Sequence, residues 1–243
     1  MSFDTLAPYY RIMELVTAGG VLQRSRTAFL AEAANSRRAL LLGEGPGRFL
    51  GELLRTNPYV EVTCVERSPR MIEEARKRLT ESELARVHFL QADALTWQPL
   101  TPSLFPSDGE RVAEGRVRGI LQSQEVERRL HGKFDLIVTH FFLDCFRREE
   151  LAELVAKIAE SATEDARWLL ADFREPESGW RRWRGRAALA LMYGFFRVAT
   201  GLSAARLTPP DGFLETGGFH LASRRRANFG LVHSDLWQRA KSA

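Results

Sequence analysis

The chain has 243 residues, of which 44% are hydrophobic and 27% charged, and this composition is ordinary for one globular α/β domain. No apolar run approaches the roughly 18 residues of a membrane-spanning helix, and the acidic, aromatic start is unlike a secretion signal, so we expect a cytoplasmic protein. The two cysteines, Cys64 and Cys145, lie in or beside apolar strand patterns and are expected to be buried reduced thiols.

The net charge of +4 is unevenly distributed along the chain. From Trp180 onward there are eleven basic and three acidic residues, so this part carries a charge of +8. A basic segment of this kind can bind nucleic acid or an anionic membrane surface. It can equally be the solvated outer face of a helix and a hairpin.

The first predicted elements are two helices over residues 4–18 and 21–34, which together form an N-terminal helical cap over residues 1–35. Leu6, Tyr10 and Met13 fall on one face of the first helix.

A glycine-rich loop follows the first predicted strand. The apolar run from Ala39 to Leu42 is typical of a buried parallel strand, and it leads into Gly43, Gly45 and Gly47. Glycines at a strand end let the backbone turn sharply and approach a ligand closely. A helix is predicted over residues 47–56, ended by Pro58.

The second predicted strand, residues 61–66, ends on a carboxylate. Glu66 follows Gly47 by 19 residues, near the spacing of about 20 at which a nucleotide-binding βαβ unit places an acid on ribose hydroxyls. The loop and the acid together predict an adenosine-containing cofactor. A pyrophosphate is not favoured, because Arg48 occupies the place of the third glycine of G-x-G-x-x-G and the chain has no Gly-Lys-Ser/Thr motif.

The glycine pattern resembles the first motif of class I S-adenosylmethionine-dependent methyltransferases. The resemblance implies that the loop passes under the methionine and ribose portions of S-adenosylmethionine and that Glu66 holds the ribose. Residues 3–10 resemble the entry helix of the ubiquinone/menaquinone-biosynthesis type of small-molecule methyltransferase.

Later segments resemble the same family in the same order. Arg67 and Met71 lie in a segment, within a helix predicted over residues 69–81, where a hydrophobic residue packs on the adenine. Residues 87–94 resemble the third strand and its turn, in which Asp93 would accept a hydrogen bond from the adenine amino group. The cofactor site that the resemblance implies comprises Tyr10, Gly43, Glu44, Gly45, Gly47, Glu66, Arg67, Met71, Asp93, Ala94 and His140.

One position departs from the family pattern. The acid that usually stands two residues before the first glycine is replaced here by Leu41. Glu44, inside the loop, is the nearest group that could compensate by orienting the loop and the cofactor. The alternative is that Glu44 is a solvated loop residue.

Residues 99–131 interrupt the alternation of strands and helices. Four helix- or strand-breaking residues (Pro99, Pro102, Pro106 and Gly109) open this stretch, and we interpret it as a surface insertion.

The fourth and fifth predicted strands carry the candidate catalytic residues. His140 ends the fourth strand, whose end faces the transferable methyl group in the resembled family, and it is the candidate base because imidazole titrates near neutral pH. The alternative is a histidine that lines the cofactor pocket. Asp172, at the end of the fifth strand, is the second candidate, as an electrostatic or hydrogen-bonding group. Asp144 lies near a strand end too, but two acids are weak support for a metal, and none is expected.

The remaining elements complete the sheet. An amphipathic helix is predicted over residues 149–163, a helical segment on the acceptor side over residues 174–215, and a hairpin from strands 219–226 and 230–237. The predicted fold is α/β: one domain over residues 1–243 with a doubly wound, Rossmann-like, mostly parallel seven-stranded sheet and a C-terminal antiparallel hairpin.

The function that these features predict is methyl transfer from S-adenosylmethionine to an oxygen or carbon of a small, hydrophobic or aromatic acceptor. The amphipathic stretch from Trp180 to Arg197 could cover such an acceptor, lie on a membrane surface or pack in the core. Two other functions stay open: a nucleic-acid methyltransferase guided by the basic C-terminal part, which no recognised RNA- or DNA-binding motif supports, and a non-catalytic module that kept the cofactor pocket.

Overall fold

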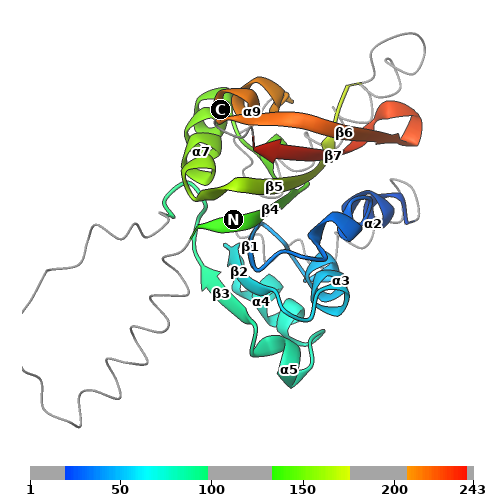
Figure 1. The fold of residues 1–243 in the computed structure, drawn as a ribbon, viewed down its shortest axis with the longest axis vertical. Helices are drawn as coiled ribbons and strands as arrows, with labels where there is room; N and C mark the ends of the chain where they lie inside the picture. The colour runs from blue at the N-terminus through cyan, green and yellow to red at the C-terminus, as the bar shows by residue number, and fades with distance from the viewer. Residues whose placement is uncertain (1–19, 98–132, 176–206, 240–243) are drawn as a thin grey trace, which may run out of the picture.

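The computed structural model describes residues 20–97, 133–175 and 207–239, which form one seven-stranded sheet in the order β3-β2-β1-β4-β5-β7-β6 (Figure 1). The strands are β1 (Arg38–Leu42), β2 (Glu61–Glu66), β3 (Val87–Gln91), β4 (Phe134–His140), β5 (Ala162–Phe173), β6 (Phe219–Ala227) and β7 (Val232–Arg239).

The first five strands are parallel, and β7 is antiparallel to both of its neighbours, β5 and β6. The predicted α/β class, the mostly parallel seven-stranded sheet and the C-terminal hairpin are therefore confirmed. The antiparallel strand β7 lies inside the sheet rather than at its edge, because the last hairpin inserts β7 between β5 and β6.

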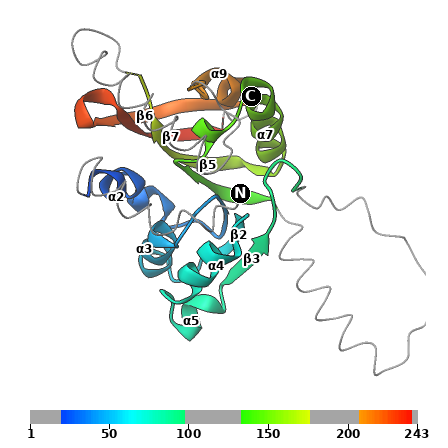
Figure 2. The same cartoon turned by 180° about the vertical axis from the view of Figure 1, so that it is seen from behind.

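Helices cover both faces of the sheet (Figures 1 and 2). The helices are α2 (Val21–Arg26), α3 (Arg48–Thr56), α4 (Pro69–Arg76), α5 (Glu81–Leu84), α7 (Arg148–Glu160) and α9 (Asp211–Thr216). The predicted helices that begin near residues 47, 69 and 149 are confirmed as α3, α4 and α7. The Ser68 hydroxyl caps α4 by accepting a hydrogen bond from the Met71 N–H, with Pro69 at the first helical position.

Three expectations about helices need correction. The helix predicted over residues 21–34 ends at Arg26, because the Thr27 hydroxyl bonds back to the Gln23 carbonyl and the chain continues as a turn and the 3-10 helix Leu30–Ala33. The helix predicted over residues 69–81 ends at Arg76, and Thr80 begins α5 with a capping box. The helix predicted over residues 149–163 ends at Glu160, because β5 begins at Ala162. Helix α9 was not predicted individually. The predictions for residues 4–18, for the insertion 99–131 and for most of 174–215 fall outside the described residues.

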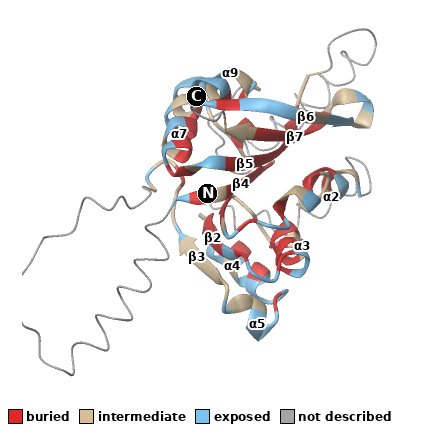
Figure 3. Ribbon diagram, in the orientation of Figure 1, coloured by how far each residue is buried: buried red, intermediate tan, exposed pale blue. Residues whose placement is uncertain are grey.

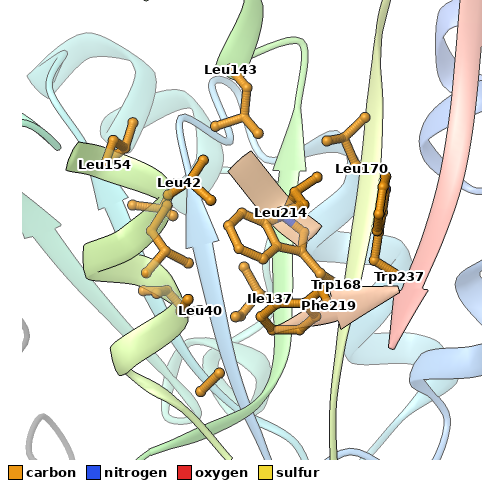
Figure 4. Close-up of a cluster of buried hydrophobic side chains, with 14 of the residues drawn as sticks. Leu40, Leu42, Ile137, Leu143, Leu154, Trp168, Leu170, Leu214, Phe219 and Trp237 are labelled. Atoms are coloured by element: carbon orange, nitrogen blue, oxygen red, sulfur yellow. The ribbon is translucent and has the colours of Figure 1, made fainter. Parts of the chain in front are cut away.

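The hydrophobic core has two halves, one on each face of the sheet. Helix α7 contributes Leu151 and Leu154, and α9 contributes Leu214, to the cluster that surrounds Trp168 and Trp237 (Figure 4). Phe49 and Leu53 of α3 form the other half with Leu41 and Val138. Strands β4 and β7 are therefore buried along most of their length, whereas β6 is largely exposed (Figure 3).

Several arginines of the basic C-terminal part have internal partners. Arg224 binds both carboxylate oxygens of Asp235 at 2.7 and 2.6 Å, and it also binds Asp211, which pairs with Arg174. Burial alone would raise the pKa of Asp235, but the hydrogen bonds from Arg224 outweigh it and lower that pKa. The expectation of a purely solvated basic face is therefore wrong for Arg224.

None of the helices in the described part of the chain is long and apolar enough to cross a membrane.

Candidate functional site

The candidate site lies where the strand order reverses. Strands β1 and β4 are neighbours at the centre of the sheet, while the chain leaves β1 toward β2 and leaves β4 toward β5. In open α/β sheets, ligands bind at this switch point, outside the carboxyl ends of the strands. Two segments flank it here: the loop Gly43–Gly47 after β1 and the turn from Phe141 to Cys145 after β4.

The three glycines of the loop all have positive φ, but the space around them differs. A Cβ on Gly43 would collide with the ring of Phe142, and one on Gly47 would lie 2.8 Å from the Ala75 Cβ of α4. A Cβ on Gly45 would meet nothing within 4 Å. The expectation that all three glycines make room for a ligand therefore needs correction: Gly43 and Gly47 make room for the protein's own side chains, and only Gly45 faces open space.

Glu66 lies against the loop, as predicted. Its carboxylate accepts hydrogen bonds from the Gly45 N–H at 3.1 Å and the Ser68 N–H at 2.9 Å. These two bonds hold the carboxylate at the end of β2, beside the one glycine with free space around it.

Glu44 is half-buried and points toward α3. One carboxylate oxygen accepts hydrogen bonds from the Phe49 and Leu50 N–H groups at 2.8 and 2.9 Å, in the first turn of that helix. Burial raises the pKa of Glu44 to about 7, and the two N–H groups and the Arg26 charge only partly oppose that rise. These bonds do not fit a purely solvated loop residue, because they tie the Glu44 carboxylate to the first turn of α3. Whether Glu44 also orients the cofactor stays a prediction. Leu41, at the usual acid position, has no polar group that could make such bonds and is fully buried in the core.

The predicted adenine-side residues gather at the ends of β2 and β3. The Asp93 carboxylate accepts from the Leu95 N–H at 3.0 Å and lies 3.6 Å from the exposed Arg67 guanidinium. Met71 is buried at the start of α4, and the Ala94 side chain belongs to the core cluster on the α7 face. Tyr10 lies outside the described residues.

His140 is buried at the end of β4. Its ring packs edge-on against Phe49 with ring centroids 4.6 Å apart, and its Nδ1 has no hydrogen-bond partner in the described part of the chain. Burial, assisted by the Arg26 charge, lowers the pKa of His140 well below its ordinary value. The imidazole is therefore neutral at physiological pH and retains a lone pair.

Asp172 is buried at the end of β5, next to Asp144 and Cys145. Neither Asp172 oxygen meets hydrogen-bond geometry with a described residue, although the Asp144 carboxyl and the Phe142 and Asp144 N–H groups are close enough to act on it. Burial, then the Asp144 charge, raises the pKa of Asp172 well above its ordinary value. Burial and the same two acids also raise the pKa of the Cys145 thiol, and Cys145 and Cys64 are both unpaired by disulfides.

The two predicted catalytic residues lie on opposite faces of the sheet. Side chains alternate along a strand, so His140 shares the face of Leu136 and Val138 with α3, whereas Asp172 shares the face of Trp168 with α7. The structure therefore does not bring His140 and Asp172 together.

Sequence reasoning missed three residues at the site. Arg26 reaches it from α2, acts on Glu44 and His140, and lies over the Phe141 ring. Phe142 covers Gly43. His233 is paired across the strands with Asp172 and contacts Asp235 at 3.0 Å. The alternation of β7 was the available signal for His233, but Arg26 and Phe142 depend on long-range packing.

The described residues fit an adenosyl ligand better than a metal. The open space at Gly45 beside the Glu66 carboxylate suits a ribose, and the unpartnered oxygens of Asp172 lie at the same edge of the sheet. Within the described ranges, no group of three or more His, Cys, Asp and Glu residues could hold a metal ion.

Residues 39–105, which include the glycine loop, Glu66 and Asp93, match the family model described as a methyltransferase domain. The chain is 31% identical over 102 residues to malonyl-[acyl-carrier protein] O-methyltransferase from Paenibacillus sp., and 34% identical over 95 residues to demethylmenaquinone methyltransferase from Deinococcus radiodurans. These alignments cover 42% and 38% of this chain but only 36% and 39% of the relatives, little more than a third of each.

Solved structures of methyltransferases share the fold. Magnesium protoporphyrin IX methyltransferase from Synechocystis PCC 6803, solved with bound S-adenosylhomocysteine, matches 98% of this chain and 95% of its own with a TM-score of 0.61 and 17% identity. Mitomycin 7-O-methyltransferase matches 99% of this chain and 61% of its own, with a TM-score of 0.59 and 20% identity. This chain therefore shares its fold with these solved methyltransferases. The predicted resemblance to S-adenosylmethionine-dependent methyltransferases is confirmed.

Replacing Glu44 with Gln is expected to change how stability depends on pH. Because the folded-state pKa is raised from 4.5 to about 7, the folded protein holds this proton more tightly, and the wild type loses up to about 3 kcal/mol of stability as the pH rises through that window. The variant lacks this loss. Urea unfolding at a series of pH values should show the stability of Glu44→Gln rising relative to wild type up to about pH 7. Glu52→Gln, on the exposed side of α3, is the control, and a difference that stays flat with pH would contradict the assignment.

The glycine substitutions should separate packing from open space. Gly43→Ala combines a left-handed backbone with a collision at Phe142 and is expected to cost about 3 kcal/mol of stability. Gly45→Ala bears only the backbone strain and is expected to cost about 1 kcal/mol. Chemical denaturation of both variants measures the difference, and equal losses would refute the different roles of the two positions.

Proposed function

We propose that this protein is an S-adenosylmethionine-dependent methyltransferase that acts on an oxygen or carbon of a small, hydrophobic or aromatic acceptor. The observation that carries the proposal is the Glu66 carboxylate, bonded to the Gly45 N–H beside the one loop glycine that faces open space. The methyltransferase-domain match over residues 39–105, which contains this arrangement, supports it. The activity of the curated relatives supports it for the aligned third of their length.

The residues that would hold the cofactor have distinct tasks. Glu66 would accept hydrogen bonds from the ribose hydroxyls, and Asp93 would accept one from the adenine amino group, with Met71 and Arg67 beside the base. The backbone at Gly45 would lie closest to the ligand, because a side chain there would fill the space. When bound, S-adenosylmethionine supplies an activated methyl group, so the protein's main contribution is to position the acceptor and exclude water.

A small-molecule acceptor is supported by what several fold neighbours act on. One neighbour, from neocarzinostatin biosynthesis, was solved with a methyl-substituted hydroxynaphthoic acid, and another is named for mitomycin. The use of Arg224 in an internal ion-pair network weakens the nucleic-acid alternative, because that charge is already neutralised by Asp235 and Asp211.

His140 is the candidate group that accepts the acceptor's proton. Its imidazole is neutral and its Nδ1 lacks a partner among the described residues, so it can accept a proton, and its lowered pKa makes it a weaker base than a free imidazole. Asp172 has a different character, because its raised pKa favours the protonated form, which can donate a hydrogen bond through its O–H as well as accept one.

Binding and turnover assays test the proposal. Calorimetry should detect S-adenosylmethionine and S-adenosylhomocysteine binding to purified, ligand-free protein. Glu66→Gln should weaken both by about tenfold or more, because a charged acceptor for two hydroxyl groups is lost. Glu61→Gln, at the exposed other end of β2, is the matched control and should bind normally. Phenols, quinones, acyl acids and lipids should then be screened by S-adenosylhomocysteine release. Protein that binds neither nucleoside would overturn the proposal.

Substituting His140 with Gln distinguishes a base from a pocket-lining residue. If His140 accepts the proton, kcat should fall by about a hundredfold or more and the acidic limb of its pH profile should disappear, while cofactor affinity stays the same. Unchanged turnover with an unchanged pH profile would leave His140 as a packing partner of Phe49.

A further inference from the structure

The buried carboxyl group of Asp172 is incompletely satisfied by the fold. Asp172 is 1% exposed, and both of its oxygens lack a hydrogen-bond partner among the described residues. An unsatisfied buried carboxyl group is costly, so its position calls for a ligand that the fold alone does not supply.

The place of Asp172 is fixed by a short chain of contacts from the glycine loop. Phe142 packs on Gly43, so the turn after β4 lies directly against the loop. Phe142 and Asp144 of the same turn present their N–H groups toward Asp172. Asp172 therefore lies under this turn, across β1 and β4 from Glu66.

A nucleoside bound by Glu66 and Asp93 would occupy the side of the switch point nearest to β2 and β3. The other end of an adenosyl ligand would then extend past Gly45 toward β4 and β5. In S-adenosylmethionine, that end carries the sulfonium, which is a permanent positive charge. In S-adenosylhomocysteine, the same atom is a neutral thioether.

We propose that Asp172 and the adjacent Asp144 form the anionic binding site for the sulfonium, and that binding of the sulfonium releases a proton from this pair to solvent. This proposal rests on the proposed function. A cation beside two acids that repel each other favours their ionised form, so the ligand and the proton compete for the pair. The protein would then hold the charged donor more tightly than the neutral product, and the difference would grow as the pH rises.

None of the other titratable or charged groups described around Asp172 supplies a positive charge that would neutralise it. Asp144 and Cys145 approach from the turn after β4, and His233 lies opposite on β7 with its Nδ1 on Asp235. Arg224 and Arg174 are engaged elsewhere, in three ion pairs: Arg224 with Asp235, Arg224 with Asp211, and Arg174 with Asp211. His140, on the neighbouring strand, faces the other side of the sheet.

The experiment compares two ligands that differ at one atom. Dissociation constants of S-adenosylmethionine and S-adenosylhomocysteine are measured by calorimetry from about pH 6 to about pH 8, in two buffers of different ionisation enthalpy. The amino and carboxyl groups of the ligands are shared, so their titration cancels in the ratio of the two constants. For the wild type, the preference for S-adenosylmethionine should grow by about tenfold over this range, with net proton release for that ligand alone.

Two variants and one control identify the groups involved. In Asp172→Asn, the pair no longer shares a proton, so the preference should become flat with pH. The double variant Asp144→Asn, Asp172→Asn removes both charges and should lose about tenfold of the preference at about pH 8. Asp165→Asn, at the exposed opposite end of β5, should behave as wild type. Thermal unfolding should show Asp172→Asn to be at least as stable as wild type, because the amide is neutral at every pH and needs no bound proton.

The outcomes separate this proposal from the proposed function. The assignment of a sulfonium site to Asp172 is overturned if the wild-type preference for S-adenosylmethionine does not depend on pH, or if Asp172→Asn keeps the same pH dependence. In either case cofactor binding itself stands. A rise in the acceptor KM of Asp172→Asn with no change in the ratio also overturns that assignment and assigns Asp172 to the acceptor. Failure of both nucleosides to bind the wild type overturns the proposed function itself.

Discussion

The left-handed loop from Gly43 to Gly47 is the constraint on which the rest of the site depends. Its first and last glycines are pressed against Phe142 and Ala75, so the turn after β4 and the helix α4 can approach only because these positions lack a Cβ. The loop thereby aligns the carboxyl ends of β1, β2 and β4 with the first turn of α3. Gly45 is the remaining position, and it is the one at which the backbone is open to a ligand.

Acidic groups are gathered around this loop, and the fold gives each a different environment. Glu44 is held by the first turn of α3 and by the charge of Arg26, and Glu66 is held by two backbone N–H groups. Asp172 makes no hydrogen bond of accepted geometry with a described residue, although the Phe142 and Asp144 N–H groups lie near it. Backbone donors thus satisfy Glu44 and Glu66 on the loop side, whereas Asp172 on the β5 side still requires a proton or a cation to offset the cost of its burial.

The parts of the fold that local patterns encode were predictable. Strand β2 matches its predicted bounds, and the Ser68-Pro69 start of α4 follows from capping chemistry that involves a few neighbouring residues. The early end of α2 was not predictable in this way, because Thr27 can continue a helix or bond back to it with similar ease. The glycine loop was predicted correctly, but the reason given for Gly43 and Gly47 was partly wrong. These two glycines make room for Phe142 and Ala75, which come from distant segments of the chain.

Site chemistry was less predictable than site location. The resemblance pointed to Glu66 and Asp93, which lie at the ends of adjacent strands as expected. Which way Glu44 turns, and that Asp144 approaches Asp172, depend on how loops pack across the sheet edge. The period-two alternation of β4 and β5 does separate His140 from Asp172, so the faces of the two candidates could have been read from the strand patterns.

This separation has a consequence for the proposed chemistry. Methyl transfer to a hydroxyl removes one positive charge from the donor and frees one proton from the acceptor. If the charge is lost beside Asp172 and the proton is taken up at His140, the acceptor must reach both side chains across the carboxyl ends of β4 and β5, because the attacking oxygen lies next to the transferred methyl group. The imidazolium formed at His140 would then face Phe49 and Arg26 rather than an acid. It would therefore hold its proton weakly and return it to solvent readily. A base in such a place is suited to repeated turnover, whereas a histidine paired with a buried carboxylate would retain its proton.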